Sequence, residues 1–354
     1  MISTSEKLAG PGQNLVQTGQ TGCYDESGHA IPCRDSGQDG FFRSGLAWPV
    51  PRFRRTGQTV ADLLTGLTWT AHANPAEFPL TWGEALDFVR TMNAREEHGY
   101  SDWRLPNRRE LRSLISYQAR RPALPEQHPF SGVFLGWYWT STTAAINPAY
   151  AWYVHMDGAR MFYGRKDQDC LFWPVRGKSI VLAETGQRVC YDQAGHKLSE
   201  PDSLQDGAGF SGRSWPTERF IPAADTVLDR LTGLEWLRMA SLTRAEVNWI
   251  EALRLVLALN AELPGNARIW RLPNVNELES LVDCSAHSPA LPGNHPFFAL
   301  REVYWSSTTS FFEPAWAWAL YLNKGALGVG VKRAGNFHVW PVRDGAARQG
   351  ASAP

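Results

Sequence analysis

The stretch that decides the fold reads Tyr100-Ser101-Asp102-Trp103-Arg104-Leu105-Pro106-Asn107, and its second half returns as Trp270-Arg271-Leu272-Pro273-Asn274. The two copies are 167 residues apart (270 − 103). In each copy the asparagine is a preferred helix N-cap, and a glutamate, Glu110 or Glu277, follows at the third helical position. The sequence therefore predicts the same capped helix twice.

The repeat extends along most of the chain. Cys23-Tyr24-Asp25 returns at Cys190, Leu64-Thr65-Gly66-Leu67 at Leu231, and Trp173-Pro174-Val175-Arg176 at Trp340. This period is longer than that of solenoids or propeller blades, so it predicts two tandem domains of ordinary size. We assign residues 18–178 and 185–345 to the two domains, 179–184 to a linker, and 1–17 and 346–354 to disordered tails.

Positions that agree between the copies are expected to serve the fold, and positions that differ are free to serve function. The agreeing tryptophans are interpreted as shared core: Trp69, Trp139, Trp152 and Trp173, matched by Trp236, Trp305, Trp318 and Trp340.

Each copy is predicted to hold two helices followed by β-structure. Thr81 and Glu84 form a capping box for the first helix, and Thr243 with Glu246 is expected to do so in copy two. The β-region covers 138–142, 151–156 and 173–176, and Pro174 suggests an edge position for the closing strand. Two helices followed by an antiparallel sheet give the fold class α+β.

Composition narrows the choice of partners. The chain has 35 Lys and Arg against 35 Asp and Glu, a formal net charge of zero, which argues against nucleic acid or an anionic membrane as the general partner. No apolar run is long enough to span a membrane. Sixteen tryptophans in 354 residues favour a binding role, because aromatic side chains are enriched at recognition surfaces.

Five cysteines leave the redox state partly open. Cys23 and Cys33 bracket a short turn and are predicted to form a disulfide, which copy two cannot repeat because Glu200 replaces the second cysteine. Cys284 is interpreted as a buried free thiol, and a Cys170–Cys190 link remains an alternative.

Motifs of the common catalytic classes are missing from the sequence, and no set of residues has metal-ligand spacing. His128 and its counterpart His295 are interpreted as turn or core residues. We therefore expect no catalytic residue, metal or cofactor.

The predicted ligand-binding residues lie in the divergent window before each final tryptophan, where aromatic, cationic and amide side chains mix as they do in recognition surfaces. In copy two they are Phe311, Phe312, Trp316, Tyr321, Asn323, Lys324, Lys332, Arg333, Asn336 and His338. In copy one they are Tyr150, Tyr153, His155, Arg160, Tyr163, Arg165 and Lys166. The alternative is a solvated face with a few core aromatics. The basic side chains of copy one would suit a sulfated glycan.

Several motifs together resemble a bacterial family named after the C-terminal domain of the Legionella collagen-like adhesin. They are Thr65–Trp69, Trp82–Ala85, Tyr100–Asn107, Tyr138–Thr142 and Trp173–Arg176. The resemblance covers both copies, although Ile269 replaces Asp102 in the second. It implies two C-type-lectin-like domains, display on the cell envelope, and binding of a polysaccharide or protein through a ligand face that is diversified in some members.

We therefore expect a non-enzymatic recognition or adhesion protein located outside the cell. Residues 1–20 are polar and contain no segment like a signal peptide, so a cytoplasmic location is the alternative if the chain is complete. A homo-oligomer stays open. Two other functions also remain: an oxidase like the formylglycine-generating enzymes, which needs a pair of reactive cysteines, and a structural module of a surface fibre.

Overall fold

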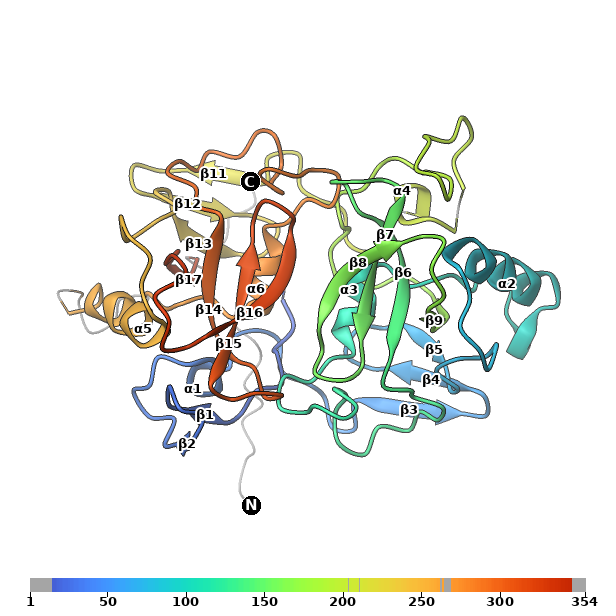
Figure 1. Ribbon diagram of the computed structural model, residues 1–354, viewed down its shortest axis with the longest axis horizontal. Coiled ribbons are helices and arrows are strands. Elements are labelled where there is room, and N and C mark those ends of the chain that lie inside the picture. The colour runs from blue at the N-terminus through green and yellow to red at the C-terminus, as the bar shows by residue number, and fades with distance from the viewer. Residues whose placement is uncertain (1–14, 203, 210, 262, 264–268, 346–354) are drawn as a thin grey trace, which may run out of the picture.

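The computed structural model describes residues 15–345 apart from 203, 210, 262 and 264–268. Residues 1–14 of the tail predicted for 1–17, and all of the tail predicted for 346–354, lie outside these residues. Residues 15–17 are described, and Val16 forms a β-bridge with Leu46. Two similar halves of mixed helix and sheet stand side by side (Figure 1), which confirms the α+β class and the repeated unit.

The elements of repeat one follow in chain order. They are β1 (Cys23–Tyr24), β2 (Ala30–Ile31), α1 (Asp39–Phe42), β3 (Phe53–Thr56), β4 (Thr59–Asp62), β5 (Thr68–Thr70), α2 (Trp82–Ala94), the 3-10 helix η1 (Glu97–Gly99), α3 (Arg108–Ser113), β6 (Trp137–Thr143), β7 (Tyr150–His155), β8 (Met161–Arg165), β9 (Leu171–Phe172) and β10 (Val175–Arg176).

Repeat two has a shorter set. Its elements are α4 (Asp206–Gly209), β11 (Phe220–Pro222), β12 (Thr226–Asp229), β13 (Leu234–Leu237), α5 (Trp249–Ala258), α6 (Val275–Ser280), β14 (Val303–Thr309), β15 (Trp316–Tyr321), β16 (Ala326–Val331) and β17 (Val342–Asp344).

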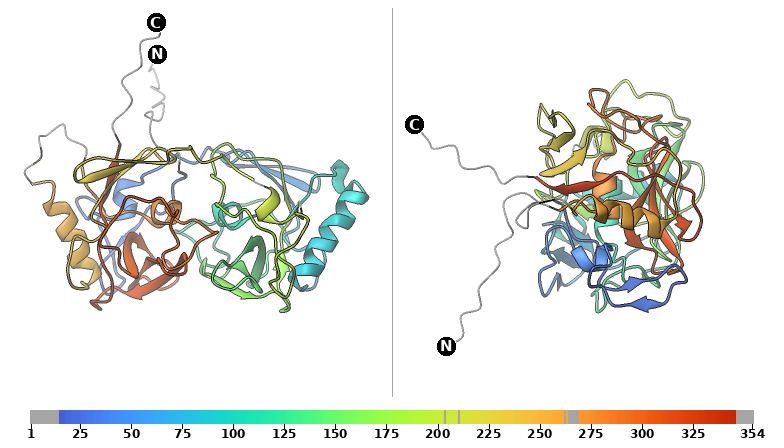
Figure 2. Two further views of the ribbon diagram at one scale, coloured as in Figure 1. Left: turned by 90° about the horizontal axis from the view of Figure 1, so that it is seen from above. Right: turned by 90° about the vertical axis from the view of Figure 1, so that its left-hand side faces the viewer.

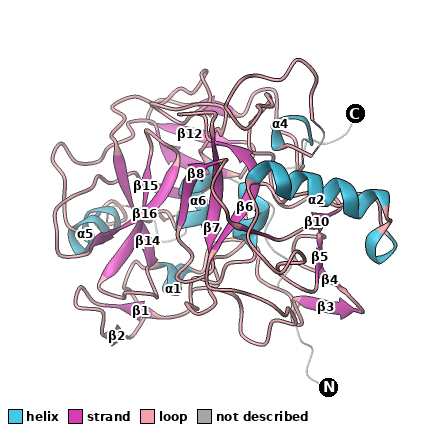
Figure 3. Cartoon of the chain, turned by 45° about the vertical axis from the view of Figure 1, so that its right-hand side comes forward, coloured by secondary structure: helices cyan, strands magenta, loops and turns pink. Residues whose placement is uncertain are grey.

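Each repeat builds two sheets of three or four strands, and β1 and β2 pair separately; Figure 3 shows the β6-β7-β8 strands apart from β3, β4, β5 and β10. In repeat one the strand orders are β10-β5-β4-β3 and β8-β7-β6-β9, and in repeat two they are β11-β12-β13-β17 and β14-β15-β16. The closing strands β10 and β17 lie at sheet edges, which confirms the prediction made from Pro174. Neighbouring strands are antiparallel except for β6 and β9.

The repeated Trp-Arg-Leu-Pro-Asn motif joins the second helix to the sheets. Trp103 is fully buried, and Arg104 makes a bidentate ion pair with the buried Glu110 at 2.6 and 2.7 Å. The same carboxylate accepts the Asn107 N–H, while the Asn107 side chain caps α3, so the predicted capping box is present. Asn274 and Glu277 repeat the box in α6. One glutamate thus satisfies both a cation and a helix terminus.

The predicted start of the first helix is right in repeat one and wrong in repeat two. Thr81 and Glu84 cap α2 as expected. In repeat two the helix α5 begins at Trp249, and the cap is Asn248 rather than Thr243. Asn248 is the true counterpart of Thr81, and its side chain accepts the Glu251 N–H at 2.9 Å.

The shared tryptophans form the core, as predicted. All eight are at most 2% exposed: Trp69, Trp139, Trp152, Trp173, Trp236, Trp305, Trp318 and Trp340. Core residues of both repeats also belong to one continuous cluster, in which Tyr117 of repeat one contacts Trp318 of repeat two with ring centroids 5.4 Å apart. The two halves therefore do not fold around wholly separate cores.

The N-terminal segments of the two repeats are exchanged. Residues 15–46, which we call N-segment one, lie against repeat two, and residues 182–213, N-segment two, lie against repeat one. Figure 1 shows this exchange: α1 and β1 lie beside the red strands of repeat two, and α4 lies beside the green strands of repeat one. Figure 2 shows the same arrangement from two other sides. Each half of the folded molecule therefore combines the sheets of one sequence repeat with the N-segment of the other.

Equivalent side chains anchor both N-segments to the strands. The Gln20 amide pairs with the N–H and C=O of Thr309, both at 2.8 Å, as a neighbouring strand would. Gln187 does the same with Thr143 at 2.9 and 2.8 Å. Because both backbone groups are buried, each glutamine supplies hydrogen bonds that the strand end would otherwise lack.

A buried aspartate makes the second anchor. Asp39 Oδ2 accepts hydrogen bonds from Thr18 of its own segment and Thr308 of repeat two, each at 2.7 Å. Asp206 does the same with Thr185 and Thr142. Burial raises the pKa of each aspartate to about 6, although the two hydroxyl donors oppose the shift.

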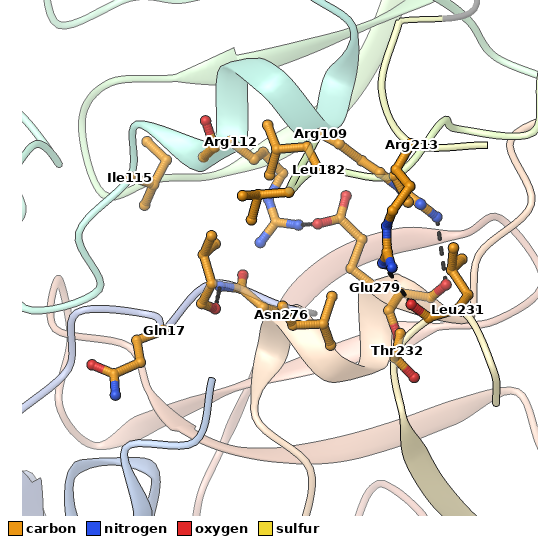
Figure 4. A pocket seen from close by; sticks show the side chains of 16 residues that line it. Gln17, Arg109, Arg112, Ile115, Leu182, Arg213, Leu231, Thr232, Asn276 and Glu279 are labelled. Carbon is orange, nitrogen blue, oxygen red and sulfur yellow. Dashed lines mark hydrogen bonds and ion pairs between the residues drawn. The ribbon is translucent and has the colours of Figure 1, made fainter. Parts of the chain in front are cut away.

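The interface between the repeats contains a small cavity of about 50 Å³. Arg112 and Glu279 line it and form a buried ion pair, drawn in Figure 4. Arg109 extends from α3 to the carbonyl of Val282 at 2.7 Å. Charged groups of repeat one thus meet acceptors of repeat two at the centre of the molecule.

The cysteine predictions are settled for the described residues. Cys23 and Cys33 form a disulfide with a Cα–Cα distance of 5.2 Å. Cys284 is a buried free thiol, as predicted, and the Cys170–Cys190 link is not made, because both residues are free and buried. The predicted linker, 179–184, packs inward at Ser179 and Ala183 rather than running through solvent.

Candidate functional site

Two of the predicted ligand residues lie in the interior. Lys166 and Lys332 are 0% exposed, so the prediction that they contact a ligand is wrong. Lys332 donates to the carbonyls of Tyr24 and Asp25 in N-segment one, at 3.2 and 3.1 Å, and its ammonium lies 4.2 Å from the Trp249 ring centroid. Lys166 holds N-segment two in the same way. Burial lowers the pKa of both lysines to about 7.

Other predicted residues of copy two also hold the two halves together. Arg333 donates to Ser27 of N-segment one, and Phe311 lies beside the Tyr24 ring with centroids 6.1 Å apart. Phe312 extends to repeat one, where the Arg121 guanidinium lies 5.4 Å from its ring centroid. Phe312 stays 40% exposed and Arg333 is also exposed, so these contacts use only part of each side chain.

The remaining copy-two residues do not form one surface. His338 is 8% exposed and its backbone pairs with β14, so its assignment as a ligand contact is wrong. Trp316, Tyr321 and Asn323 are half-buried, and Lys324 and Asn336 are exposed. Tyr321 packs beside Phe337 with centroids 5.8 Å apart.

The basic cluster predicted for copy one does not form. Lys166 is buried, Arg165 is paired with Asp167, and Arg160 lies over Trp137 instead. Tyr150 and Tyr163 lie on the other side of the sheet and pack against the central core. Without a cluster of exposed cations, this described part of repeat one has no basic surface that would attract a sulfated glycan.

Three predicted residues of copy one do come together. Tyr153, His155 and Arg160 lie on one face of the β6-β7-β8 sheet, around Trp137. The ring centroids of Tyr153 and His155 are 4.2 and 4.7 Å from that of Trp137, and the Arg160 guanidinium is 5.6 Å from it. Phe162, opposite Tyr153 in the strand register, lies at the edge of this face, with one side of its ring stacked on Tyr163 at a centroid distance of 4.6 Å.

We call this surface the aromatic face, consisting of Phe134, Trp137, Tyr153, His155, Arg160 and Phe162. Phe134 is 50% exposed and Phe162 is 44% exposed, and they lie beside the half-buried rings of Trp137 and Tyr153, so the exposed aromatic area is a patch rather than a single ring. The residue-by-residue prediction missed Phe134, Trp137 and Phe162. The signal was available for Trp137, since repeat two has Val303 at that position.

Repeat two does not reproduce the aromatic face. At the positions of Trp137, Tyr153, His155, Arg160 and Phe162 it has smaller or different side chains: Val303, Ala319, Tyr321, Ala326 and Gly328. The space that Tyr153 fills above Trp139 is filled in repeat two by Phe337, whose centroid is 4.4 Å from that of Trp305. The counterpart of Phe337 is Cys170, so the two repeats cover the same tryptophan from different strands.

A hollow of about 350 Å³ adjoins the aromatic face. We call it the sheet-side hollow; Phe134 and Trp137 form its apolar wall, and Glu77 and Asp169 add carboxylates. On the face itself, burial and the nearby Arg160 guanidinium lower the pKa of His155. The site thus offers flat aromatic area with acceptors on one side and a cation on the other.

The three free thiols have raised pKa values, as buried structural cysteines do, whereas reactive cysteines have lowered ones. Burial raises the pKa of Cys170 to about 12 and also raises the pKa of Cys190 and Cys284. A raised pKa keeps a thiol protonated and poorly nucleophilic. Within the described residues, no group of three or more His, Cys, Asp or Glu side chains could hold a metal ion, and no helix is sufficiently long and apolar to cross a bilayer.

Comparison with protein families identifies the two repeated domains. The family model of the Lcl C-terminal domain matches residues 58–176 and 225–343, which together are most of the chain. The chain belongs to the Lcl C-terminal domain family. Both Lcl C-terminal domains begin after the exchanged N-segments, and the aromatic face lies within the first of them. The suspected family and its two copies are confirmed, and no curated protein matches the chain.

Proposed function

We propose that this protein is a non-enzymatic recognition protein that binds a neutral glycan through the aromatic face of repeat one. Each repeat would be a C-type-lectin-like unit, and the chain would act in adhesion outside the cell. The aromatic face carries the proposal, because several aromatic side chains lie together there, and contiguous exposed apolar patches mark interaction sites.

The differences between the repeats support a site in repeat one alone. Trp137, Arg160 and Phe162 are replaced by Val303, Ala326 and Gly328, whereas the core tryptophans are the same in both repeats. Side chains that only support the fold should be shared by both repeats. The aromatic residues of this face therefore fit a role that repeat two does not have.

The chemistry of the face favours a neutral glycan. Trp137 and Phe162 provide flat apolar area for the C–H surface of a sugar ring, and Glu77 and Asp169 can accept hydrogen bonds from its hydroxyls. The same carboxylates would repel a sulfate group, and Arg160 is the one cation of the face. We therefore favour a neutral chain over the sulfated one expected from the sequence.

The disulfide supports display outside the cytoplasm. Cys23 and Cys33 are bonded in N-segment one, and such bonds persist mainly in oxidising compartments. The raised thiol pKa values do not support an oxidase, since that chemistry requires reactive cysteines in a shared cleft.

A glycan array probed with the full chain tests the proposal. We expect the wild type to bind neutral glycans, and Trp137→Val, which copies repeat two, to abolish binding while the chain stays folded at the assay temperature, although the loss of a half-buried ring lowers the melting temperature. Tyr321→Ala in repeat two is the matched control and should bind normally. Binding to host-surface proteins but to no glycan, or normal binding by Trp137→Val, would contradict the proposal.

A further inference from the structure

A second hollow lies beside the first, on the helix side of repeat one. It has a volume of about 320 Å³ and lies between β5 and the α2–η1 region. Phe88 provides an apolar wall, and His72, Thr91 and His98 provide polar groups. We call it the helix-side hollow. Its size falls at the lower end of the range for small-ligand sites.

Glu77 connects the two hollows. It is exposed and lines both the helix-side hollow and the sheet-side hollow, so the two hollows are neighbours. Beyond the sheet-side hollow, Trp137 continues to the aromatic face. We call the two hollows and the aromatic face together the groove.

The backbone is strained along this groove. Glu77 has φ of 65°, Glu96 of 51° and His98 of 58°, a region that residues with a Cβ seldom occupy. The Glu77 turn is closed by the Glu77 N–H donating to the Asn74 carbonyl at 3.1 Å. Strained non-glycine residues are concentrated at binding sites, where the fold holds a side chain in a required position. Here the strain places a carboxylate between the two hollows.

The groove is also where the repeats differ. At the positions of His72, Glu77 and Thr91 repeat two has Met239, Arg244 and Ala258. Arg244 is not in the left-handed region that Glu77 occupies. Both the strain and the polar groups are therefore particular to repeat one, as the aromatic face is.

We infer that the helix-side hollow is a second sugar subsite, so that repeat one binds an extended oligosaccharide whose chain passes over Glu77. One ring would lie against Trp137 and Phe134. Another would lie in the helix-side hollow against Phe88, with its hydroxyls hydrogen-bonded to His72, Thr91 and His98. The inference rests on the proposed function, since it extends the same site to a longer ligand.

Calorimetric titration of the full chain with glucose and N-acetylglucosamine oligosaccharides, from mono- to hexasaccharide, tests this subsite. We expect the affinity of the wild type to increase with length. The double variant His72→Met/Thr91→Ala, which copies repeat two in the helix-side hollow, should bind the hexasaccharide roughly tenfold more weakly, which is about 1.4 kcal/mol. It should bind the shortest binding sugar as the wild type does, because His72 and Thr91 line the helix-side hollow and not the sheet-side hollow.

The outcomes separate the two proposals. Affinity that does not change with length, or a hexasaccharide that binds His72→Met/Thr91→Ala as tightly as the wild type, overturns the second subsite while the aromatic face still stands. If Trp137→Val binds every oligosaccharide normally, or if no oligosaccharide binds the wild type, both proposals fail. Met239→His/Ala258→Thr in repeat two is the matched control and should leave every affinity unchanged.

Discussion

Arg112 and Glu279 occupy the same position in the two repeats (279 − 112 = 167), and they form an ion pair with each other across the interface. In a symmetric pair of identical units, a residue near the axis would face its own copy. Two arginines or two glutamates would then meet in a buried place. Opposite charges at this position are available only because the two units differ in sequence.

Reversing one charge of this pair should destabilise the whole molecule. In Glu279→Arg, the new guanidinium faces Arg112 and Arg108, and breaking a buried ion pair usually costs about 3–5 kcal/mol of unfolding free energy. Chemical denaturation measures this loss. The double variant Arg112→Glu/Glu279→Arg should recover part of it, since Arg108 still lacks its partner. Equal stability of Glu279→Arg and the wild type would show that the pair does not hold the repeats together.

The buried aspartates predict a specific pH dependence. The pKa of Asp39 is raised from 3.8 to about 6, so the folded state binds more protons than the unfolded state between these values. The contribution of Asp39 to stability is therefore highest below about pH 4, and it is lost as the pH rises through 6. The maximum loss is about 3 kcal/mol, from roughly two pKa units.

Asp39→Asn removes this proton uptake and keeps a hydrogen-bond acceptor for Thr18 and Thr308. Its unfolding free energy, compared with that of the wild type, should therefore improve steadily from pH 4 to 7. Asp206→Asn should give the same trend in repeat one. Parallel pH curves for wild type and variant would argue that Asp39 titrates normally in the folded protein.

Hydrogen exchange can test whether the N-segments are independently held. Gln20 accepts the Thr309 N–H at 2.8 Å, and Gln187 accepts the Thr143 N–H at 2.9 Å. In Gln20→Ala the Thr309 amide should exchange faster while the Thr143 amide stays protected. Gln187→Ala should give the reverse. Loss of protection at both amides in either variant would mean that the two segments release together.

Much of the fold could be predicted from the sequence because its determinants are local. Asn107 with Glu110 fixed one helix start, and the repetition at Asn274 confirmed it independently. In α5 the same logic failed, because Thr243 and Glu246 also fit the capping-box pattern and Asn248 was overlooked. The capping pattern alone does not decide between Thr243 and Asn248 as the first residue before the helix.

The exchange of the N-segments and most of the site could not be predicted. Gln20 and Thr309 are 289 residues apart, and no local pattern reports a contact at that distance. Lys332 is predicted to contact a ligand because lysines are usually exposed. In the structure its ammonium instead donates hydrogen bonds to two carbonyls of N-segment one, those of Tyr24 and Asp25. The comparison of repeats did find Tyr153, His155 and Arg160, because their counterparts differ.

Tyr153 covers Trp139 in repeat one, and Phe337 covers the equivalent Trp305 in repeat two. A phenylalanine at the position of Phe337 should therefore be able to replace Tyr153 in repeat one. Tyr153→Ala removes the ring that packs on Trp139, and we expect a loss of roughly 2–4 kcal/mol by chemical denaturation. Adding Cys170→Phe, which copies Phe337, should restore much of this stability. If Tyr153→Ala/Cys170→Phe is no more stable than Tyr153→Ala, then a ring at position 170 cannot replace the ring of Tyr153.

The central claim is that ligand recognition belongs to the aromatic face of repeat one. Hydrogen exchange of the full chain, with and without a saturating neutral glycan from the array, tests it most directly. We predict new protection in residues 133–139 and 153–162, and none in the matching segments 300–305 and 319–328. Protection confined to repeat two, or divided equally between the repeats, would contradict the account.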